Sequence, residues 1–224
     1  KRFSQNFQVS LSYTWSKIID DTPDATAVTV PGDDRKVVQS VFNIRDDRGL
    51  GVADTPHRLV ASGTWDLNYF KGGNKAVKAL IGGWQLGGIL QANSNPPYSP
   101  VVNLDINNDG NLATDRVPGF GRNSQRNGKF VKFDFRLQKD LSLTERFKLQ
   151  LIGELFNAFN RVNFGSLTGG NFYNNQAFTA TINTTTGGAT PTAPIVTLAP
   201  RADFNTPSSA LESRIGQLAI KLIF

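Results

Sequence analysis

The fold of this chain is decided by an alternating stretch near its start, Phe7-Gln-Val-Ser-Leu-Ser-Tyr-Thr-Trp15. Apolar and polar residues take turns along it, which places them on opposite faces of an extended strand. The same period of two recurs along the chain, and it predicts strands at residues 6–16, 57–70, 81–94, 131–138, 148–156 and 215–224. A helix would need a period of 3.6, so the sequence predicts an all-β protein.

The connections between these predicted strands alternate in length. Two are short turns, at residues 71–75 and 142–145, and three are long, at about residues 17–56, 96–129 and 161–212. Structureless loops of that size are rare in compact soluble domains. Short turns on one side and long loops on the other are typical of outer-membrane barrels. We therefore predict part of an antiparallel up-and-down transmembrane β-barrel, with long extracellular loops and a periplasmic C-terminus.

The amino-acid composition excludes several classes of protein. The 224 residues contain no cysteine, which excludes a disulfide framework, a thiol nucleophile and cysteine-ligated zinc. A single histidine, His57, excludes a two-histidine catalytic relay. No run approaches the roughly 18 consecutive apolar residues of a transmembrane helix, whereas a membrane strand needs only about 9–11 alternating ones. The mean hydropathy of -0.28 therefore leaves membrane barrels open.

The chain begins with Lys1 and contains no methionine, so we expect a processed or truncated piece. On this interpretation residues 1–224 are the C-terminal segment of an outer-membrane β-barrel, without its plug and N-terminal strands. Six strands should not close a membrane barrel, because bacterial single-chain barrels start at about eight. An open sheet in lipid would leave unpaired backbone groups along both edges.

Several aromatic residues lie near the ends of the predicted strands, as in the aromatic girdles of membrane barrels. The predicted periplasmic boundary holds Phe7, Tyr69, Trp84 and Phe224, and the outer boundary holds Tyr13 and Trp15. The alternative is a soluble β-sandwich in which these aromatics form the core. The polar faces are as continuous as the apolar ones and the long loops lie on one side, so we favour the barrel.

Several longer motifs follow one another over nearly the whole chain. They are Arg2-Phe-Ser4 with Tyr13-Thr-Trp-Ser-Lys-Ile-Ile-Asp20, Asp54-Thr-Pro-His-Arg-Leu-Val-Ala-Ser62, Gly83-Trp-Gln85, Asp105-Ile-Asn-Asn-Asp-Gly110 with Asp115-Arg-Val-Pro-Gly119, Gly121-Arg-Asn-Ser124, Glu154-Leu-Phe-Asn-Ala-Phe-Asn-Arg-Val-Asn-Phe164 and Ala219-Ile-Lys-Leu-Ile-Phe224. In this order they resemble the C-terminal barrel part of TonB-dependent outer-membrane receptors. The resemblance is to the Oar-like group, which has an N-terminal carboxypeptidase-regulatory-like domain and is abundant in Acidobacteria.

The resemblance implies a barrel of about 22 strands, of which these would be the last six. It also implies partners: outer-membrane lipid, the remaining strands and plug domain of the same protein, and TonB through the missing plug. The C-terminal strand implies one more, the barrel-assembly machinery, which in this family reads a final aromatic preceded by apolar residues at every second position. The residues that fit this assembly signal are Leu218, Ile220, Leu222 and Phe224. The alternative is an ordinary amphipathic edge strand that ends in Phe.

One loop motif has the oxygen ligands of a calcium site. The candidate ligands are Asp105, Asn107, Asp109 and Asp115, with a glycine after the third of them. Arg116 stands where a calcium loop carries its bidentate Glu, and no helices flank the motif. The sequence therefore favours an Asx-rich turn satisfied by its own backbone, with calcium as the alternative.

The remaining polar residues indicate no catalytic site, and we expect no enzyme and no other cofactor. The aspartate pairs Asp20-Asp21 and Asp46-Asp47 lie in the first long loop, where adjacent carboxylates are usually solvated. His57 heads a strand without a nucleophile motif and is expected to be a structural histidine at the membrane interface.

The net charge of +6 and the pI near 9.7 invite a nucleic-acid hypothesis. The positions of the charges argue against it, because lysines and arginines with inward parity are interleaved with acids. They are Lys132, Arg136, Lys148 and Lys221, with Asp134 and Glu154. Such a mixture suits a barrel lumen that faces a plug or a polar solute. Lys71, Lys75 and Lys78 cluster near a short turn, where they would meet anionic headgroups.

The sequence thus predicts a receptor that captures a ligand with its loops and imports it across the outer membrane of a Gram-negative cell. Two other interpretations stay open. One is a structural or adhesive outer-membrane barrel without transport, and the other is a secreted β-sandwich with a calcium-stabilised loop. The sequence does not identify the ligand.

Overall fold

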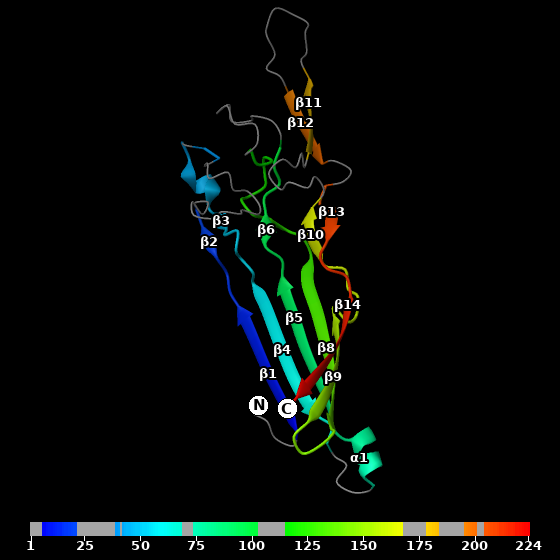
Figure 1. Ribbon diagram of the computed structural model, residues 1–224. Helices are drawn as coiled ribbons and strands as arrows, with labels where there is room; N and C mark the ends of the chain where they lie inside the picture. The colour runs from blue at the N-terminus through cyan, green and yellow to red at the C-terminus, as the bar shows by residue number, and fades with distance from the viewer. Residues whose placement is uncertain are drawn as a thin grey trace, which may run out of the picture.

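The computed structural model describes residues 6–21, 39–40, 42–68, 74–102, 115–167, 178–183, 195–200 and 204–224. Its main element is a six-stranded antiparallel sheet with the strand order β1-β4-β5-β8-β9-β14 (Figure 1). The strands are β1 (Phe7–Trp15), β4 (His57–Asp66), β5 (Trp84–Ser94), β8 (Lys129–Ser142), β9 (Lys148–Phe156) and β14 (Ile215–Ile223). The predicted all-β class and the antiparallel up-and-down order are therefore confirmed.

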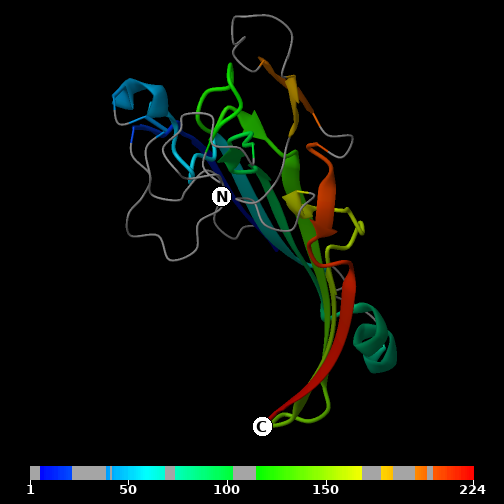
Figure 2. The ribbon, with the colours of Figure 1, turned by 90° about the horizontal axis from the view of Figure 1, so that it is seen from above.

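The register of the sheet sorts the side chains onto two faces, as the period of two predicts. One row across neighbouring strands is apolar: Phe7, Trp65, Leu86 and Leu137. The next row is polar or small: Gln8, Thr64, Gly87, Arg136 and Glu154. The sheet is curved and remains open, with β1 and β14 at its edges (Figure 2).

The structure corrects the predicted connection between the second and third strands. Instead of a short turn and a strand from residue 81, the chain forms the helix α1 (Lys75–Ile81), and β5 begins only at Trp84. The reason is visible in the spacing of Val77, Leu80 and Ile81, which is that of a helix face, whereas strict alternation starts after Gly83. The preceding strand also ends earlier than predicted, at Asp66.

The fourth strand is longer than predicted, because β8 runs for 14 residues rather than from 131 to 138. The long connections contain short paired strands of their own. These are β2 (Ile19–Asp20) with β3 (Gly49–Leu50), β6 (Pro97–Tyr98) with β7 (Gln125–Arg126), β10 (Phe164–Leu167) with β13 (Pro207–Ala210), and β11 (Phe178–Asn183) with β12 (Ile195–Pro200). A 3₁₀ turn, η1 (Ile44–Asp47), precedes β3.

The buried apolar side chains of the described residues lie outside the large sheet. They are Tyr98, Val101, Val102 and Val117, in and after β6. Many large apolar residues of the sheet are exposed instead, as Leu11 and Leu218 are at 69% and 90%. Among the described residues, the apolar core is therefore in the loops, and many large apolar side chains of the sheet are not covered by protein.

Candidate functional site

The polar face of the sheet carries opposite charges in register. Arg136 of β8 lies directly across from Glu154 of β9, and Arg136 Nη1 is 3.4 Å from Glu154 Oε1. Farther along β8, Lys132 Nζ is 3.5 Å from Asp134 Oδ2. Both pairs are partly exposed. The predicted sharing of one face by these bases and acids is confirmed, and it makes a mixed-charge wall.

A hollow of about 370 Å³ runs over this polar face between β1 and β9. Its lining combines the polar side chains of Gln8, Ser10, Ser62 and Thr64 with the apolar side chains of Ile89, Phe135 and Phe156 and the charged groups of Asp134, Arg136 and Glu154. A surface with donors, acceptors and both charges can contact a polar protein segment or a hydrated solute.

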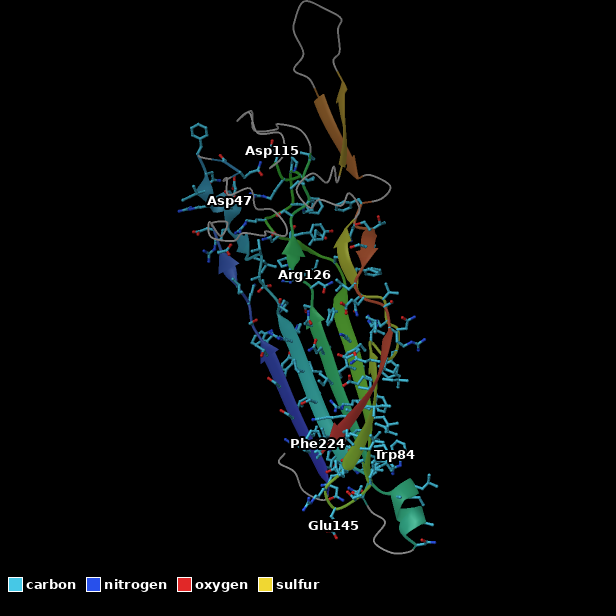
Figure 3. All side chains as sticks on the ribbon, viewed as in Figure 1. Asp47, Trp84, Asp115, Arg126, Glu145 and Phe224 are labelled. Carbon is cyan, nitrogen blue, oxygen red and sulfur yellow. The ribbon has the colours of Figure 1, made fainter. Side chains whose placement is uncertain are left out.

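Above the strands, three arginines pair with three aspartates and form what we call the loop-base network: Asp20, Asp47, Asp54, Arg116, Arg122 and Arg126. Arg116 Nη1 is 2.7 Å from Asp47 Oδ1, and both side chains are almost fully buried. Arg122 pairs with Asp20, and Arg126 pairs with Asp54. Figure 3 shows Asp47, Asp115 and Arg126 at the loop end of the sheet.

These ion pairs also bind the backbone, so they fasten the first long connection to the second. Asp54 Oδ1 accepts a hydrogen bond from the Ile18 backbone N–H at 2.6 Å. Arg126 Nη1 donates to the carbonyl oxygens of Asp54 and Asn95 at 2.8 and 2.9 Å. The buried charges of Asp54 and Arg126 thus have several partners each, which is what a charge removed from water needs.

Asn123, which is fully buried, completes this junction. Its side-chain amide donates to the Leu50 carbonyl at 2.7 Å, and its backbone N–H donates to Ser99 Oγ at 2.8 Å. Its φ of +51° is a conformation that asparagine tolerates better than most residues. Nearby, Arg116 Nη2 also donates to the Asp46 carbonyl at 3.0 Å.

The loop-base network corrects the prediction of solvated loop aspartates for one member of each pair. Asp47 is only 2% exposed and the half-buried Asp20 is paired with Arg122, whereas Asp21 and Asp46 are exposed as predicted. Asp20 and Asp47 looked solvated because their arginine partners lie some 70 to 100 positions away in the sequence. The sequence offers only a general signal for them, the three arginines Arg116, Arg122 and Arg126 in the second long connection.

The candidate calcium loop lies mostly outside the described residues, since only Asp115 of its four predicted ligands falls within them. The Asp115 carboxylate is buried, and its Oδ1 accepts a hydrogen bond from Gln39 Nε2 at 3.2 Å. Within the described part of the chain, no group of three or more histidines and carboxylates could hold a metal ion. Calcium binding at Asp105, Asn107, Asp109 and Asp115 stays a prediction.

The remaining predicted residues lie where the alternation places them. Leu218, Ile220 and Leu222 share one face of β14 and are exposed, as is Phe224 after the strand. Phe224 and Trp84 lie at the end of the sheet opposite the loops (Figure 3). His57 Nδ1 is 2.8 Å from the Tyr13 hydroxyl at the loop end of β1 and β4. Tyr69 lies outside the described residues.

The fold and these surfaces define a class, the wall of a membrane β-barrel with ordered loops at one end. The family model of the outer membrane beta barrel domain matches residues 1–120 and 116–192, so the chain belongs to that family. The protein is accordingly one of the outer membrane of a Gram-negative type of cell envelope. No curated protein and no solved structure matches it. No helix in the described ranges is long and apolar enough to cross a membrane.

Proposed function

We propose that this chain forms the C-terminal wall and part of the extracellular mouth of a TonB-dependent receptor. In this proposal the loops capture a ligand, and a plug domain inside the barrel rearranges when TonB pulls on it from the periplasm. Residues 1–224 are then one segment of a larger barrel whose other strands pair with β1 and β14. The proposal assigns no covalent reaction to the protein.

The observation that carries the proposal is the mixed-charge wall. A pore that conducts small ions selectively would favour rings of one sign, whereas alternating Arg136, Glu154, Lys132 and Asp134 can pair with the surface of a folded plug. Partly exposed pairs exchange partners at small cost, because each contributes only about 0–1 kcal/mol. This suits a plug that must be held and then moved.

The loop-base network supports ligand capture, because it holds the first and second long connections in a fixed relation. Buried ion pairs specify one arrangement of the segments they join. Binding by preordered loops loses less conformational entropy than binding by free ones. In this proposal the loop-base network holds the ligand-binding loops in place at the mouth of the barrel.

TonB dependence is tested on the protein as the cell makes it. Its coding sequence should contain a plug domain and a TonB-contacting segment upstream of Lys1, and the purified protein should bind the periplasmic domain of TonB. Deletion of the contacting segment is the matched control and should abolish binding while the protein still reaches the outer membrane. A barrel without plug and without TonB binding would contradict the transport proposal and favour the structural or adhesive alternative.

A further inference from the structure

The helix α1 is exposed on an apolar side, which is unusual for a short surface helix. Val77, Leu80 and Ile81 are 40%, 74% and 49% exposed. Their spacing of three and four positions places them on one face of the helix. The sequence of the helix, Lys75-Ala-Val-Lys-Ala-Leu-Ile81, adds two lysines and no acid. Apolar residues on one face and lysines in the same turn or two are typical of helices that lie in a membrane interface.

The C-terminal end of α1 is fastened to the sheet by Lys139 of β8. Lys139 Nζ donates to the Leu80 carbonyl at 3.1 Å and to the Gly82 carbonyl. The Trp84 indole N–H donates to the same Leu80 carbonyl at 3.1 Å, and the ammonium lies 5.0 Å from the centre of the Trp84 ring. These donors satisfy helix-end carbonyls that have no partner within the helix.

Gly83, which follows α1, packs closely against β8, and this limits the movement of the helix relative to the sheet. Gly83 has a φ of +73°, and a Cβ at this position would lie 2.4 Å from the Asp140 carbonyl oxygen. The Gly83 carbonyl accepts a hydrogen bond from the Asp140 N–H at 2.8 Å, and the Gly83 N–H donates to Asn68 Oδ1 at 2.6 Å. The helix is therefore tied to both β8 and the segment after β4.

The position of Lys139 decides on which side of the sheet α1 lies. Lys139 pairs directly with Trp84 and shares the apolar face of β8 with Leu137 and Leu141. A lysine on a lipid-facing surface is costly unless it reaches polar groups, and here the α1 carbonyls supply them. Figure 2 shows α1 on the convex side of the curved sheet, and Figure 1 shows it at the end opposite the loops.

We propose that α1 is an interfacial anchor that lies in the periplasmic leaflet of the outer membrane, with Val77, Leu80 and Ile81 among the lipid chains. The argument for lipid as the occupant is continuity, because α1 extends the apolar face of the sheet at its periplasmic end. Lys139 and Trp84 position the helix at the boundary between hydrocarbon and headgroups. The inference rests on the proposed orientation, in which the short connections face the periplasm.

Residues 1–224 contain no cysteine, so single introduced cysteines can report how deeply α1 lies in the membrane. A single cysteine is introduced as Leu80→Cys, Leu155→Cys or Thr144→Cys in the full-length protein, which is labelled with an environment-sensitive fluorophore and reconstituted in phosphatidylcholine vesicles. Leu155 is the control on the apolar face of the sheet, and Thr144 is the control on the other short connection. Quenching is measured with nitroxides attached near the lipid headgroup, with nitroxides near the chain end, and with a soluble quencher.

We expect the label at position 80 to be quenched at least about two-fold more by the shallow nitroxide than by the deep one, as for a side chain about 5–10 Å into the interface. The label at 144 should respond only to the soluble quencher. A further variant, Lys139→Gln, should reduce quenching at position 80, whereas Lys132→Gln should not. This separates fastening of the helix from a general effect of lost charge.

Three results would overturn the anchor. If position 155 is quenched by lipid nitroxides and position 80 only by the soluble quencher, α1 projects into water while the sheet still spans the membrane. If position 80 is shielded from all three quenchers, protein covers it. If neither 80 nor 155 responds to lipid nitroxides, the membrane orientation of the sheet fails as well, and the proposed function fails with it.

Discussion

The large sheet and the loop-base network treat charge and apolar surface in opposite ways. In the sheet, apolar side chains such as Leu11 and Leu218 are exposed, and the ion pair between Arg136 and Glu154 is open to water. In the loops, Asp47, Asp54 and Arg122 are among the most buried side chains of the described residues. The same chain therefore buries its charges where it is surrounded by water and exposes its apolar residues where it is surrounded by lipid.

The difference follows from the solvent of each region. In an outer-membrane barrel, lipid covers the apolar face, so the strands need only a period of two and paired backbone hydrogen bonds. Among the described residues, the loops bury only a few apolar side chains, namely Tyr98, Val101, Val102 and Val117, and must hold several separate segments together in water. Arginine suits this, because its planar group donates several hydrogen bonds to carboxylates and carbonyls at once. Polar contacts of arginine therefore contribute much of what holds the loops together.

The largest effect is expected from removing one buried charge of the loop-base network. Asp47→Ala leaves the buried Arg116 without its carboxylate and takes the acceptor of the Gln39 N–H away. Breaking a buried pair in this way costs about 3–5 kcal/mol. Local opening of the loops should become roughly a hundred to several thousand times more frequent, measured as the rate of trypsin cleavage in outer-membrane preparations.

The neighbouring residue supplies the matched control. Asp46→Ala removes an exposed carboxylate that accepts from Asn43, while the Asp46 carbonyl that binds Arg116 is retained. Its cleavage rate should change by less than about five-fold, as for most surface substitutions. Equal rates for the two variants would mean that the loops are not held by the buried pair.

The second prediction compares the cost of an added arginine on the apolar face and on the polar face of the sheet. Phe135→Arg places a cation in the middle of the apolar face of β8 and should destabilise the protein in phospholipid vesicles by about 2–4 kcal/mol. Ile89→Arg adds the same charge on the polar face, where residue 89 lies directly across from Asp134, and should cost less than about 1 kcal/mol. Both are measured by urea titration of the folded fraction. Similar losses would break the assignment of the faces.

The third prediction uses Tyr98, a buried residue of the loop core whose hydroxyl donates to Asn205 Oδ1 at 2.8 Å. Burial raises the pKa of Tyr98 to about 12, since the phenolate would lose its hydration. The unfolded chain ionises near pH 10 and the folded loop does not. The folded loop should therefore lose about 1.4 kcal/mol of stability per pH unit from pH 10 until pH 12.

Ultraviolet absorbance of the phenolate follows this titration directly. Tyr98→Phe should remove the phase near pH 12 and with it the loss of loop stability between pH 10 and 12. Tyr13→Phe, which changes an exposed tyrosine, should leave that phase in place. A late phase that survives Tyr98→Phe would belong to another residue and would refute the burial of Tyr98.

The sequence was sufficient for the sheet because the interactions that form it are local and repetitive. Alternation in β1, β5 and β14 predicted the faces, and the alternation of connection lengths predicted the strand order. The boundaries failed where a second period intervened, as at Ile81, which belongs to α1. An apolar residue such as Ile81 fits the period of a helix and that of a strand equally well. Only the start of β5 at Trp84 assigns it to the helix.

The loop-base network could not be predicted in this way. Its pairs join residues such as Asp20 and Arg122, which are 102 positions apart, and no local pattern specifies which aspartate meets which arginine. The choice depends on the geometry of β2, β3, β6 and β7, each only two residues long. The ion pairs in the loops depend on how the chain has already folded. The apolar and polar faces of the strands, in contrast, are specified by local sequence and help to determine the fold.

The smallest effect is expected from the ion pair on the polar face, and it tests what covers that face. A double-mutant cycle with Arg136→Ala and Glu154→Ala should give a coupling energy of about 0.2–1 kcal/mol that decreases with salt, because Arg136 is half exposed. Measured on barrels with and without their plug, the coupling should be larger with the plug, since a plug that excludes water strengthens the pair. Equal values would mean that no protein segment lies against Arg136 and Glu154, and the mixed-charge wall would then face open water.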